Sequence, residues 1–473
     1  MSETSQPKDV LSSLAAIVGA AHVVSDLDVI AGHLVEPRGL YRGKALALIR
    51  PASTQETARA VALCNDLRVP LVPQGGNTGL VGGQTPDSSG GEVILSLQRM
   101  NRVREIDASA NAMIVEAGVT LANAQTAAQE ADRLFPLSLA SEGTCTIGGN
   151  LSTNAGGVAV IAYGNARDLV MGLEVVLADG RVMNGLSKLR KDNTGYDLKN
   201  LFIGAEGTLG IITAAALKLF PNPRSRATAF IGIANPVKAL QLLNIARQFA
   251  GAGVTSFELI PRIGLDFVLA HANGSRDPLG SNHAWYALVE ISSQMAAGID
   301  ETMSSILEAA LEQGVIEDAS IAASHAQREA FWLLRESLSE VQGLEGGSIK
   351  HDVSIPIGAA PDFLARAREA VEAFMPGARV VAFGHLGDGN IHFNVSQPLG
   401  ADKAAFLAQW NAVNVIVHDI VAQFHGSISA EHGIGQLKRE LLKKTKDPVA
   451  LDVMRALKST LDPKGILNPG KVL

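Results

Sequence analysis

Three glycine-rich segments in the first half of the chain constrain the fold more than any other feature. They span residues 73–83, 141–157 and 204–213, and the first follows a short apolar strand predicted at Val69–Pro73. Glycine permits positive φ and lets main-chain N–H groups approach a ligand closely. Consecutive N–H groups of this kind make an anion cradle that suits a pyrophosphate. The second and third segments carry neither the Gly-Lys-Ser/Thr ending of a Walker loop nor the Gly-x-Gly-x-x-Gly pattern that opens a helix. A doubly wound nucleotide fold is disfavoured because the elements along the chain show no regular βαβ alternation.

The predicted elements form an α+β pattern without regular βαβ alternation. A capping box at Ser53–Glu56 begins a helix that runs toward Arg68. The other helices are predicted at Leu121–Leu134, Pro236–Ala250, Ala296–Gln313, Ser324–Val341 and Lys438–Lys458, and strands at Glu92–Leu97, Ala112–Glu116, Leu173–Leu177, Gly210–Ala216, Ala284–Ile291, Gly347–Ile355 and Arg379–Phe383. Paired prolines at residues 221–223 mark a boundary. We therefore expect a domain at 1–222 with a helical lead-in, a second at 223–425, and a C-terminal segment at 426–473.

Composition narrows the function. The chain has 473 residues, which is too long for a single core. Its net charge of -7 and lack of a basic block argue against nucleic-acid binding. Two cysteines, Cys64 and Cys145, leave no disulfide framework and no iron–sulfur run. The N-terminus has no signal-peptide pattern and no apolar run reaches bilayer length, so we expect a cytoplasmic protein without a membrane span.

The second half carries a pattern of metal-binding residues. His385 and His392 flank a Gly-Asp-Gly turn that would bring the two imidazoles together, and Glu431-His432 follows later. With Glu431 this gives a His₂Glu set, which suits Zn²⁺ and is compatible with Mn²⁺ or Fe²⁺. A lone histidine is more often a satisfied core residue, but the combination favours a metal. In the strand around His392, the side chain of Asn394 points to the same face.

Two further stretches suit an organic acid. Residues 348–355 alternate, which places Lys350 and Asp352 on one strand face, and Arg335 and Ser339 share a helical face. Arginine offers a planar fork that matches a carboxylate, whereas lysine adds a point charge. The alternatives are a surface ion pair of Arg335 with a neighbouring glutamate and an exposed strand lysine at position 350.

The glycine-rich segments, together with residues 163–164, 172–180 and 190–198, resemble the flavin domain of the vanillyl-alcohol oxidase superfamily. The resemblance implies an extended FAD between two α+β subdomains. The FAD contacts that it implies are Pro73, Gln74, Gly75, Gly76, Asn77, Thr78, Gly79, Gln84, Ser141, Gly143, Thr144, Gly148, Gly149, Ser152, Thr153, Asn154, Gly156, Gly157, Glu206, Gly207, Ile211 and Asn468. Some members attach flavin through a histidine in the first loop, where this chain has Asn77, so the FAD is expected to be non-covalent.

The second half resembles the substrate domain of FAD-dependent D-2-hydroxyacid dehydrogenases, most of all the D-2-hydroxyglutarate dehydrogenase group. The resemblance implies that His385, His392 and Glu431 bind zinc and that His432 is the catalytic base. It further implies that the substrate contacts Arg335, Ser339, Lys350, Asn394 and His432.

The expected reaction is oxidation of a D-2-hydroxy acid, D-2-hydroxyglutarate being favoured, by hydride transfer to FAD. Electrons would then pass to an electron-transfer flavoprotein or a quinone, because the chain has no cluster and no NAD motif. The alternatives are a D-lactate or D-malate dehydrogenase, a flavin-binding subunit of a larger oxidase, and a non-redox transferase of the alkyl-dihydroxyacetone-phosphate synthase type. Separated rather than adjacent histidines disfavour the transferase. A homodimer is one open alternative for the assembly.

Overall fold

The chain forms two compact units, and the computed structural model describes residues 7–473. Unit 1 contains the described residues up to Gly156, then Asn165–Asn222 and Glu431–Leu473. Unit 2 contains Gly157–Gly164 and Pro223–Ala430. The chain therefore crosses between the units after residues 156, 164, 222 and 430. The predicted domains included no crossing near residue 160, and the predicted C-terminal segment began at residue 426 instead of 431. The first six residues of the predicted lead-in lie outside the described residues.

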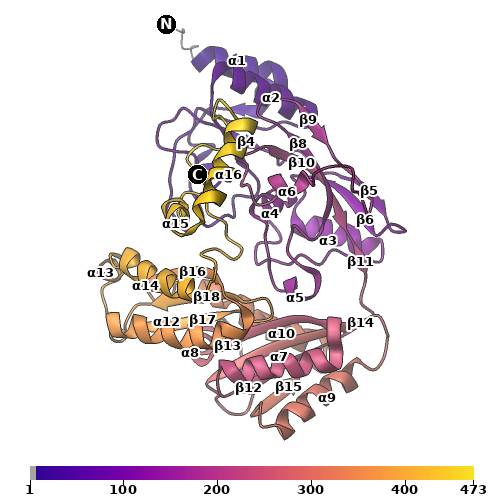
Figure 1. Ribbon diagram of the computed structural model, residues 1–473, viewed down its shortest axis with the longest axis vertical. Coiled ribbons are helices and arrows are strands. Elements are labelled where there is room, and N and C mark those ends of the chain that lie inside the picture. The colour runs from indigo at the N-terminus through magenta and orange to yellow at the C-terminus, as the bar shows by residue number, and fades with distance from the viewer. Residues whose placement is uncertain (1–6) are drawn as a thin grey trace. The chain divides into compact units, whose positions relative to one another are not determined.

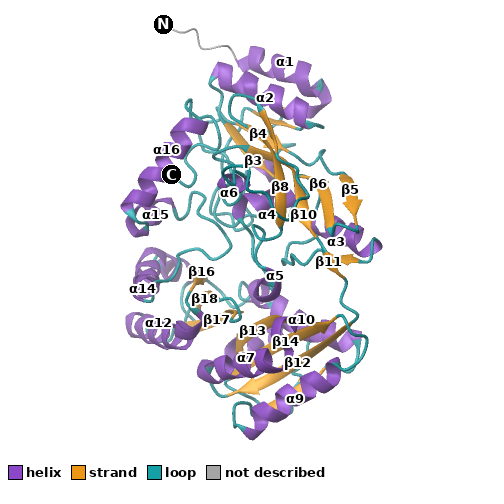
Figure 2. Ribbon diagram, turned by 45° about the vertical axis from the view of Figure 1, so that its right-hand side comes forward, coloured by secondary structure: helices purple, strands orange, loops and turns teal. Residues whose placement is uncertain are grey.

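Unit 1 contains a small, mostly parallel sheet. Its strands lie in the order β1 (Val23–Val24), β2 (Ala47–Ile49), β4 (Val93–Ser96) and β3 (Leu71–Gln74). Strands β2, β4 and β3 are parallel, and β1 is antiparallel to β2. Helices α1 (Pro7–Val18) and α2 (Thr54–Leu67) lie side by side and share the core of this sheet (Figures 1 and 2). Leu71 also bridges to Leu467, so the last segment of the chain completes this part of the unit.

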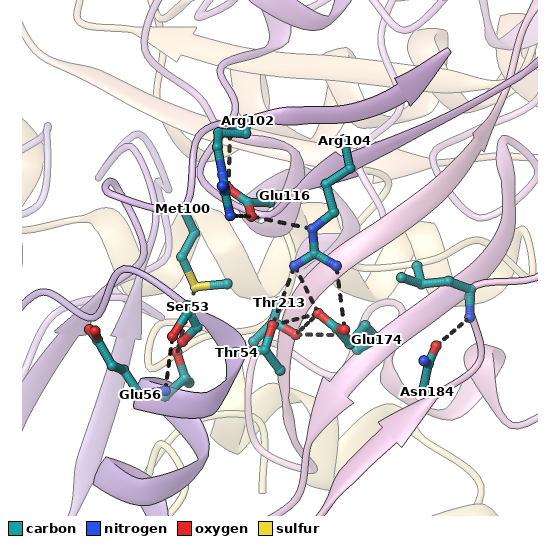
Figure 3. Close-up of polar contacts among 12 residues, drawn as sticks. Ser53, Thr54, Glu56, Met100, Arg102, Arg104, Glu116, Glu174, Asn184 and Thr213 are labelled. Carbon is teal, nitrogen blue, oxygen red and sulfur yellow. Dashed lines mark hydrogen bonds and ion pairs between the residues drawn. The ribbon is translucent and has the colours of Figure 1, made fainter. Parts of the chain in front are cut away.

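The second sheet of unit 1 is antiparallel and is crossed by a buried polar network. The strand order is β5 (Val103–Asp107), β6 (Ala112–Glu116), β10 (Ile211–Lys218), β8 (Val170–Val176) and β9 (Val182–Asn184). Arg104 pairs with Glu116 at 3.2 Å and with Glu174 at 3.1 Å, and both carboxylates are buried (Figure 3). Thr54 of α2 and Thr213 of β10 donate to Glu174 at 2.6 and 2.9 Å. Because buried charges need such partners, the network fixes α2 against the sheet.

The remaining elements of unit 1 lie around these sheets. They are α3 (Leu121–Glu130), α4 (Ile147–Thr153), α6 (Lys199–Phe202), α15 (Arg439–Thr445), α16 (Pro448–Leu461), the pair β7 (Arg133–Leu134) with β11 (Phe220–Pro221), and the short 3₁₀ turns Ala20–His22 and Ala31–His33. Lys458 of α16 donates to the carbonyl of Thr208 at 2.8 Å, which ties the yellow helices of Figure 1 to the purple elements of the same unit.

Unit 2 is built on a seven-stranded antiparallel sheet. The strand order is β15 (Asp318–Ile321), β12 (Ser225–Ile233), β14 (Trp285–Ser293), β13 (Val254–Pro261), β17 (Arg379–His385), β18 (Asn390–Ser396) and β16 (Ser348–Ser354). Its helices are α5 (Val160–Tyr163), α7 (Pro236–Ala250), α8 (Arg262–His271), α9 (Ile299–Glu312), α10 (His325–Glu336), α11 (Leu338–Val341), α12 (Ala360–Phe374), α13 (Lys403–Leu407) and α14 (Trp410–Gln423), with 3₁₀ turns at Gly251–Gly253 and Ile357–Ala359.

Helices cover both faces of the sheet in unit 2. One face packs against α7, α9, α12 and α14, of which α12 and α14 lie side by side in Figure 2. The other face contributes Phe230, Leu288 and Phe383 to a separate core with α8, α10 and α11. None of the helices within residues 7–473 combines the length and the apolar character needed to cross a bilayer.

Several predicted elements are present with shifted ends, and others were missed. The helix predicted at Ser324–Val341 is two helices, α10 and α11, separated at Ser337. The helix predicted at Lys438–Lys458 is interrupted between α15 and α16, where Asp447 caps the second helix by accepting from the N–H of Ala450. Strands β12, β13 and β15 and helices α8, α12 and α14 were not predicted. Fully buried strands such as β13 lack the alternation of polar and apolar residues that marks a half-exposed strand.

Candidate active site

A cavity of about 420 Å³ lies within unit 1 between the glycine-rich segments. The predicted FAD contacts that line it are Pro73, Gln74, Gly75, Gly76, Asn77, Thr78, Gly79, Gln84, Ser141, Gly148, Gly149, Ser152, Thr153, Glu206, Gly207 and Ile211. The lining also contains three apolar residues that the sequence did not single out, Leu97, Ala117 and Ile212. Main-chain amides beside apolar walls suit a ligand that joins a pyrophosphate to flat rings, and the volume is in the range of ligand pockets.

Glycine is required where the first two segments meet. A Cβ on Gly76 would lie 1.9 Å from the carbonyl oxygen of Thr144, and one on Gly75 would lie 2.4 Å from Oγ1 of Thr146. Thr146 is the N-cap of α4, and its side chain accepts from the N–H of Gly149. The loops can approach this closely only because these positions have no side chain.

Side chains of the first loop fix its position by donating to main-chain carbonyls, two of them in the N-terminal region. Asn77, at φ 55°, donates to the carbonyls of Gly32 at 2.8 Å and Val35 at 3.1 Å. Gln74 donates to the carbonyl of Gln84 at 3.0 Å. The Oδ1 atom of Asn77 is buried and accepts no hydrogen bond from the described residues, so it can accept one from a ligand in the cavity that Asn77 lines.

Some predicted FAD contacts lie behind the cavity wall instead of in it. Asn154 caps α4 in the left-handed region and accepts from the N–H of Arg167, and Asn468 donates to the carbonyls of Gly83 and Glu206. These two side chains support the lining. Gly143, Thr144, Gly156 and Gly157 are likewise absent from the lining.

The last segment of the chain contributes Glu431 and His432 to the same cavity. Glu206 holds this segment, since its carboxylate accepts from the N–H groups of Ile434 at 2.7 Å and Gly435 at 2.8 Å. Burial raises the pKa of Glu206, whereas these two N–H groups and the charge of Lys438 act in the opposite direction. The segment that follows His432 is thereby fixed to the cavity wall.

In unit 2, one face of the sheet carries the predicted site residues Lys350, His385, His392 and Asn394, whereas Arg335 and Ser339 lie on α10 and α11. Asn394 lies directly across from Lys350, and His392 directly across from Asp352. The β17–β18 hairpin brings the rings of His385 and His392 to a centroid distance of 5.5 Å. Adjacent imidazoles on a rigid sheet can share an ion, which is the chemistry that this pattern predicted.

Glu258 of β13 joins this face, although nothing in the sequence singled it out. Its carboxylate lies 2.6 Å from Nδ1 of His385 and accepts from Nε of Arg335 at 2.6 Å. Burial alone would raise the pKa of Glu258, but His385 and Arg335 outweigh it and lower the pKa to about 2. The guanidinium of Arg335 also lies 4.8 Å from the ring centre of Phe383. Arg335 is thus a buried, oriented group and not a member of a surface ion pair.

Lys350 and the polar groups around it complete this face. The ammonium of Lys350 donates to the main-chain carbonyl of Ser339 at 2.8 Å, while the side chain of Ser339 is exposed. The Oδ1 atom of Asn394 is buried without a hydrogen-bond partner among the described residues. Asp352 accepts from the N–H of Ala430 at 3.2 Å, and Glu431 is the next residue in the chain. Burial raises the pKa of Asp388 to about 6, although His385 opposes it.

Two family models match the chain. The model described as "FAD binding domain" matches residues 45–185, and the one described as "FAD linked oxidases, C-terminal domain" matches residues 222–472, more than half of the sequence. A protein of Bos taurus named "D-2-hydroxyglutarate dehydrogenase, mitochondrial" is 38% identical over 98% of this chain and 84% of its own length. One of Xanthomonas citri pv. viticola, named "D-2-hydroxyglutarate dehydrogenase", is 37% identical over 90% of this chain and 89% of its own.

Solved structures show the same fold at low sequence identity. A p-cresol methylhydroxylase with substrate bound has a TM-score of 0.77 at 17% identity, covering 98% of this chain and 96% of that one. An alkyldihydroxyacetonephosphate synthase has a TM-score of 0.74 at 18% identity, covering 98% and 85%. The predicted α+β fold of the vanillyl-alcohol oxidase type is confirmed, and the protein is an FAD-dependent oxidoreductase. The chain therefore belongs to the family of FAD-linked oxidases that includes the D-2-hydroxyglutarate dehydrogenases.

Proposed function

We propose that this protein oxidises D-2-hydroxyglutarate, or a close D-2-hydroxy acid, to the 2-oxo acid. The observation that carries the proposal is the polar face of unit 2, where Arg335, Lys350 and Asn394 gather beside two imidazoles. Two cations suit the two carboxylates of a dicarboxylic substrate. The buried Oδ1 of Asn394 suits a donor such as the substrate hydroxyl, since an unsatisfied buried acceptor is costly. The names of the relatives favour D-2-hydroxyglutarate over lactate or malate.

The roles of the chain's own residues follow from this chemistry. Arg335 and Lys350 bind the substrate carboxylates and fix the orientation of C2. His432, in the wall of the flavin cavity, takes the proton of the substrate hydroxyl, because an imidazole can accept a proton near neutral pH. The apolar wall at Leu97, Ala117 and Ile212 excludes water from the cavity. The bound FAD supplies the acceptor for the hydride that leaves C2.

We propose further that His385, His392 and Glu431 bind a divalent metal, with Zn²⁺ favoured. The donor set fits, because imidazole and carboxylate are preferred zinc ligands and three such ligands leave a position for substrate. Asp352, whose Oδ1 lies 3.9 Å from Nδ1 of His392, is the alternative ligand or a supporting carboxylate. When bound, the ion would supply Lewis-acid stabilisation of the developing alkoxide. The electron-transfer flavoprotein or quinone acceptor, the homodimer and the cytoplasmic location stay predictions.

Anaerobic flavin reduction tests the proposed function. The FAD-loaded protein is mixed with D- and L-2-hydroxyglutarate, D-lactate and D-malate, before and after treatment with a chelator. Rapid bleaching by D-2-hydroxyglutarate that a chelator abolishes and Zn²⁺ restores is the expected result. His432→Ala should slow the bleaching by roughly 10²–10⁴-fold while FAD stays bound. Flavin that no hydroxy acid reduces would refute the assignment.

Arg335→Lys separates the guanidinium fork from its charge. The substrate dissociation constant should rise, since lysine cannot bind a carboxylate through two parallel N–H groups. Arg262→Lys is the matched control, because Arg262 belongs to the same unit and pairs with Asp266 and Asp277 instead of facing the site residues. The control should bind D-2-hydroxyglutarate as the unmodified protein does.

A further inference from the structure

One buried carboxylate contacts residues of two different proposed functions. Glu258 has no exposed surface and lies in β13, an interior strand whose residues are all buried. A charge at such a position is strongly unfavourable unless it is paired. Its two oxygens have separate partners: Oε1 lies 2.6 Å from Nδ1 of His385, and Oε2 accepts from Nε of Arg335.

The contact with His385 determines which ring nitrogen can bind an ion. A carboxylate can only accept, so Nδ1 of His385 must carry the proton in this hydrogen bond. In the neutral imidazole the lone pair is then on Nε2, which makes Nε2 the ring nitrogen that can bind a metal. Carboxylates on the far side of a metal-binding imidazole fix its tautomer and ring orientation in this way.

The contact with Arg335 orients the guanidinium. Glu258 accepts the hydrogen bond from the Nε–H group of Arg335. The N–H groups on the two Nη atoms can then donate two parallel hydrogen bonds to a substrate carboxylate. Phe383, directly across the sheet from His392, lies under the same guanidinium. Both partners of Glu258 are themselves only 6% exposed, so neither side chain has much freedom to move away from it.

We propose that Glu258 is a positioning residue that orients the metal-binding imidazole of His385 and the substrate-binding guanidinium of Arg335 together. This inference rests on the proposed function. Because one side chain serves both groups, a change at Glu258 should weaken metal binding and substrate binding at the same time. A carboxylate that only neutralised a buried arginine would leave the metal affinity of the site unchanged.

Glu258→Gln tests the inference with little change in volume. The amide offers one accepting oxygen and one donating NH₂ group, so it cannot accept from Arg335 and His385 at once. The Zn²⁺ affinity of the apoprotein, measured by competition with a chromophoric chelator, should fall by about 10–100-fold. The dissociation constant of D-2-hydroxyglutarate, measured by anaerobic flavin reduction, should rise by roughly tenfold or more.

Glu290→Gln is the matched control. Glu290 is also nearly buried, lies on the neighbouring strand β14, and accepts from Thr228 and Trp332 instead of from site residues. Its variant should keep both affinities. Glu258→Asp retains the charge on a shorter side chain and should restore part of both affinities, and it carries the test alone if Glu258→Gln does not fold.

The outcomes separate the inference from the proposed function. A folded, FAD-loaded Glu258→Gln variant with unchanged Zn²⁺ and substrate affinities would show that Glu258 is only a structural ion-pair partner, while the proposed function would stand. Unmodified protein that neither binds Zn²⁺ nor is reduced by D-2-hydroxyglutarate would overturn both. Loss of both affinities in Glu258→Gln, with Glu290→Gln unaffected, would support the inference.

Discussion

Replacing Glu206 by glutamine should loosen the segment that carries His432. The carboxylate accepts from the N–H groups of Ile434 and Gly435 at 2.7 and 2.8 Å. Glutamine has a single accepting oxygen, so one N–H group stays bonded and the other faces an NH₂ group. An unsatisfied buried donor costs about 1–3 kcal/mol.

That free energy predicts a measurable change in local opening. A loss of about 1–3 kcal/mol corresponds to roughly 5- to 150-fold faster hydrogen exchange at the affected amides. Hydrogen-exchange mass spectrometry of the peptide around Ile434 and Gly435 measures this directly. Because His432 is two residues before Ile434, the rate of flavin reduction by D-2-hydroxyglutarate, measured per bound FAD, should fall in the same variant.

The matched control is Glu440→Gln. Glu440 belongs to the same C-terminal segment, but its carboxylate is exposed and contacts Lys443 and Arg439. Its exchange pattern and flavin reduction should match those of the unmodified protein. Unchanged exchange at Ile434 and Gly435 in Glu206→Gln would refute the claim that this carboxylate holds the segment in place.

Three further changes give separate tests. Gly76→Ala places a methyl group 1.9 Å from the carbonyl oxygen of Thr144, so the loops must separate and the purified variant should lose visible flavin absorbance. Burial raises the pKa of Glu174, but the three donors in Figure 3 outweigh it and lower the pKa below its usual 4.5. Ionised Glu174 therefore contributes stability that is present above pH 4.5 and is lost as the pH falls through the lowered pKa. In Glu174→Gln, the free energy of unfolding should fall less steeply as the pH is lowered below 4.5. Lys471→Met leaves the buried Glu92, 3.6 Å from the ammonium, without its ion-pair partner and should cost about 3–5 kcal/mol in chemical denaturation.

Each of these changes has a control or a contradicting result. Gly143→Ala meets no described atom within 4 Å and should retain flavin, so colourless protein from both glycine variants would argue against the close-approach explanation. If the free energy of unfolding fell as steeply with decreasing pH in Glu174→Gln as in the unmodified protein, the pKa argument would be contradicted. Lys443→Met, at an exposed ion pair, should alter stability by less than about 1 kcal/mol, and an equal loss in Lys471→Met would show that burial of its pair is unimportant.

Local signals made part of the fold predictable. The helix predicted at Pro236–Ala250 has those bounds because Asn235 caps it, a proline occupies its first turn and glycine follows it. Ser53 caps its helix as predicted, with the hydroxyl accepting from the N–H of Glu56, while the Glu56 carboxylate accepts from the N–H of Ala52 instead of from that of Ser53. Such signals are contained within a few residues, so one sequence is enough to read them. The interruption at Ser337 was missed because the apolar spacing continues across it.

The site was predictable where chemistry is concentrated in a short motif. His385 and His392 lie on the two strands of a hairpin whose turn contains Gly387 and Gly389, and a glycine-rich turn between two histidines is readable from sequence. Glu258 was not readable, because its partners lie 77 and 127 residues away and its own strand carries no motif that points to a site. The cavity wall at Leu97 and Ala117 was missed for a similar reason, since an apolar wall residue has the same composition as a core residue.

The order of the chain has a consequence for biosynthesis. Residues 431–473 leave the ribosome after every strand and helix of unit 2, yet they supply the bridge from Leu467 to Leu71 and the amides that hold Glu206. Unit 2 can therefore finish folding on the ribosome before unit 1, although unit 1 contains the N-terminus. The wall of the cavity is complete only once Glu431 and His432 have been synthesised, so we expect flavin to be captured after translation of this segment and not by the growing N-terminal half.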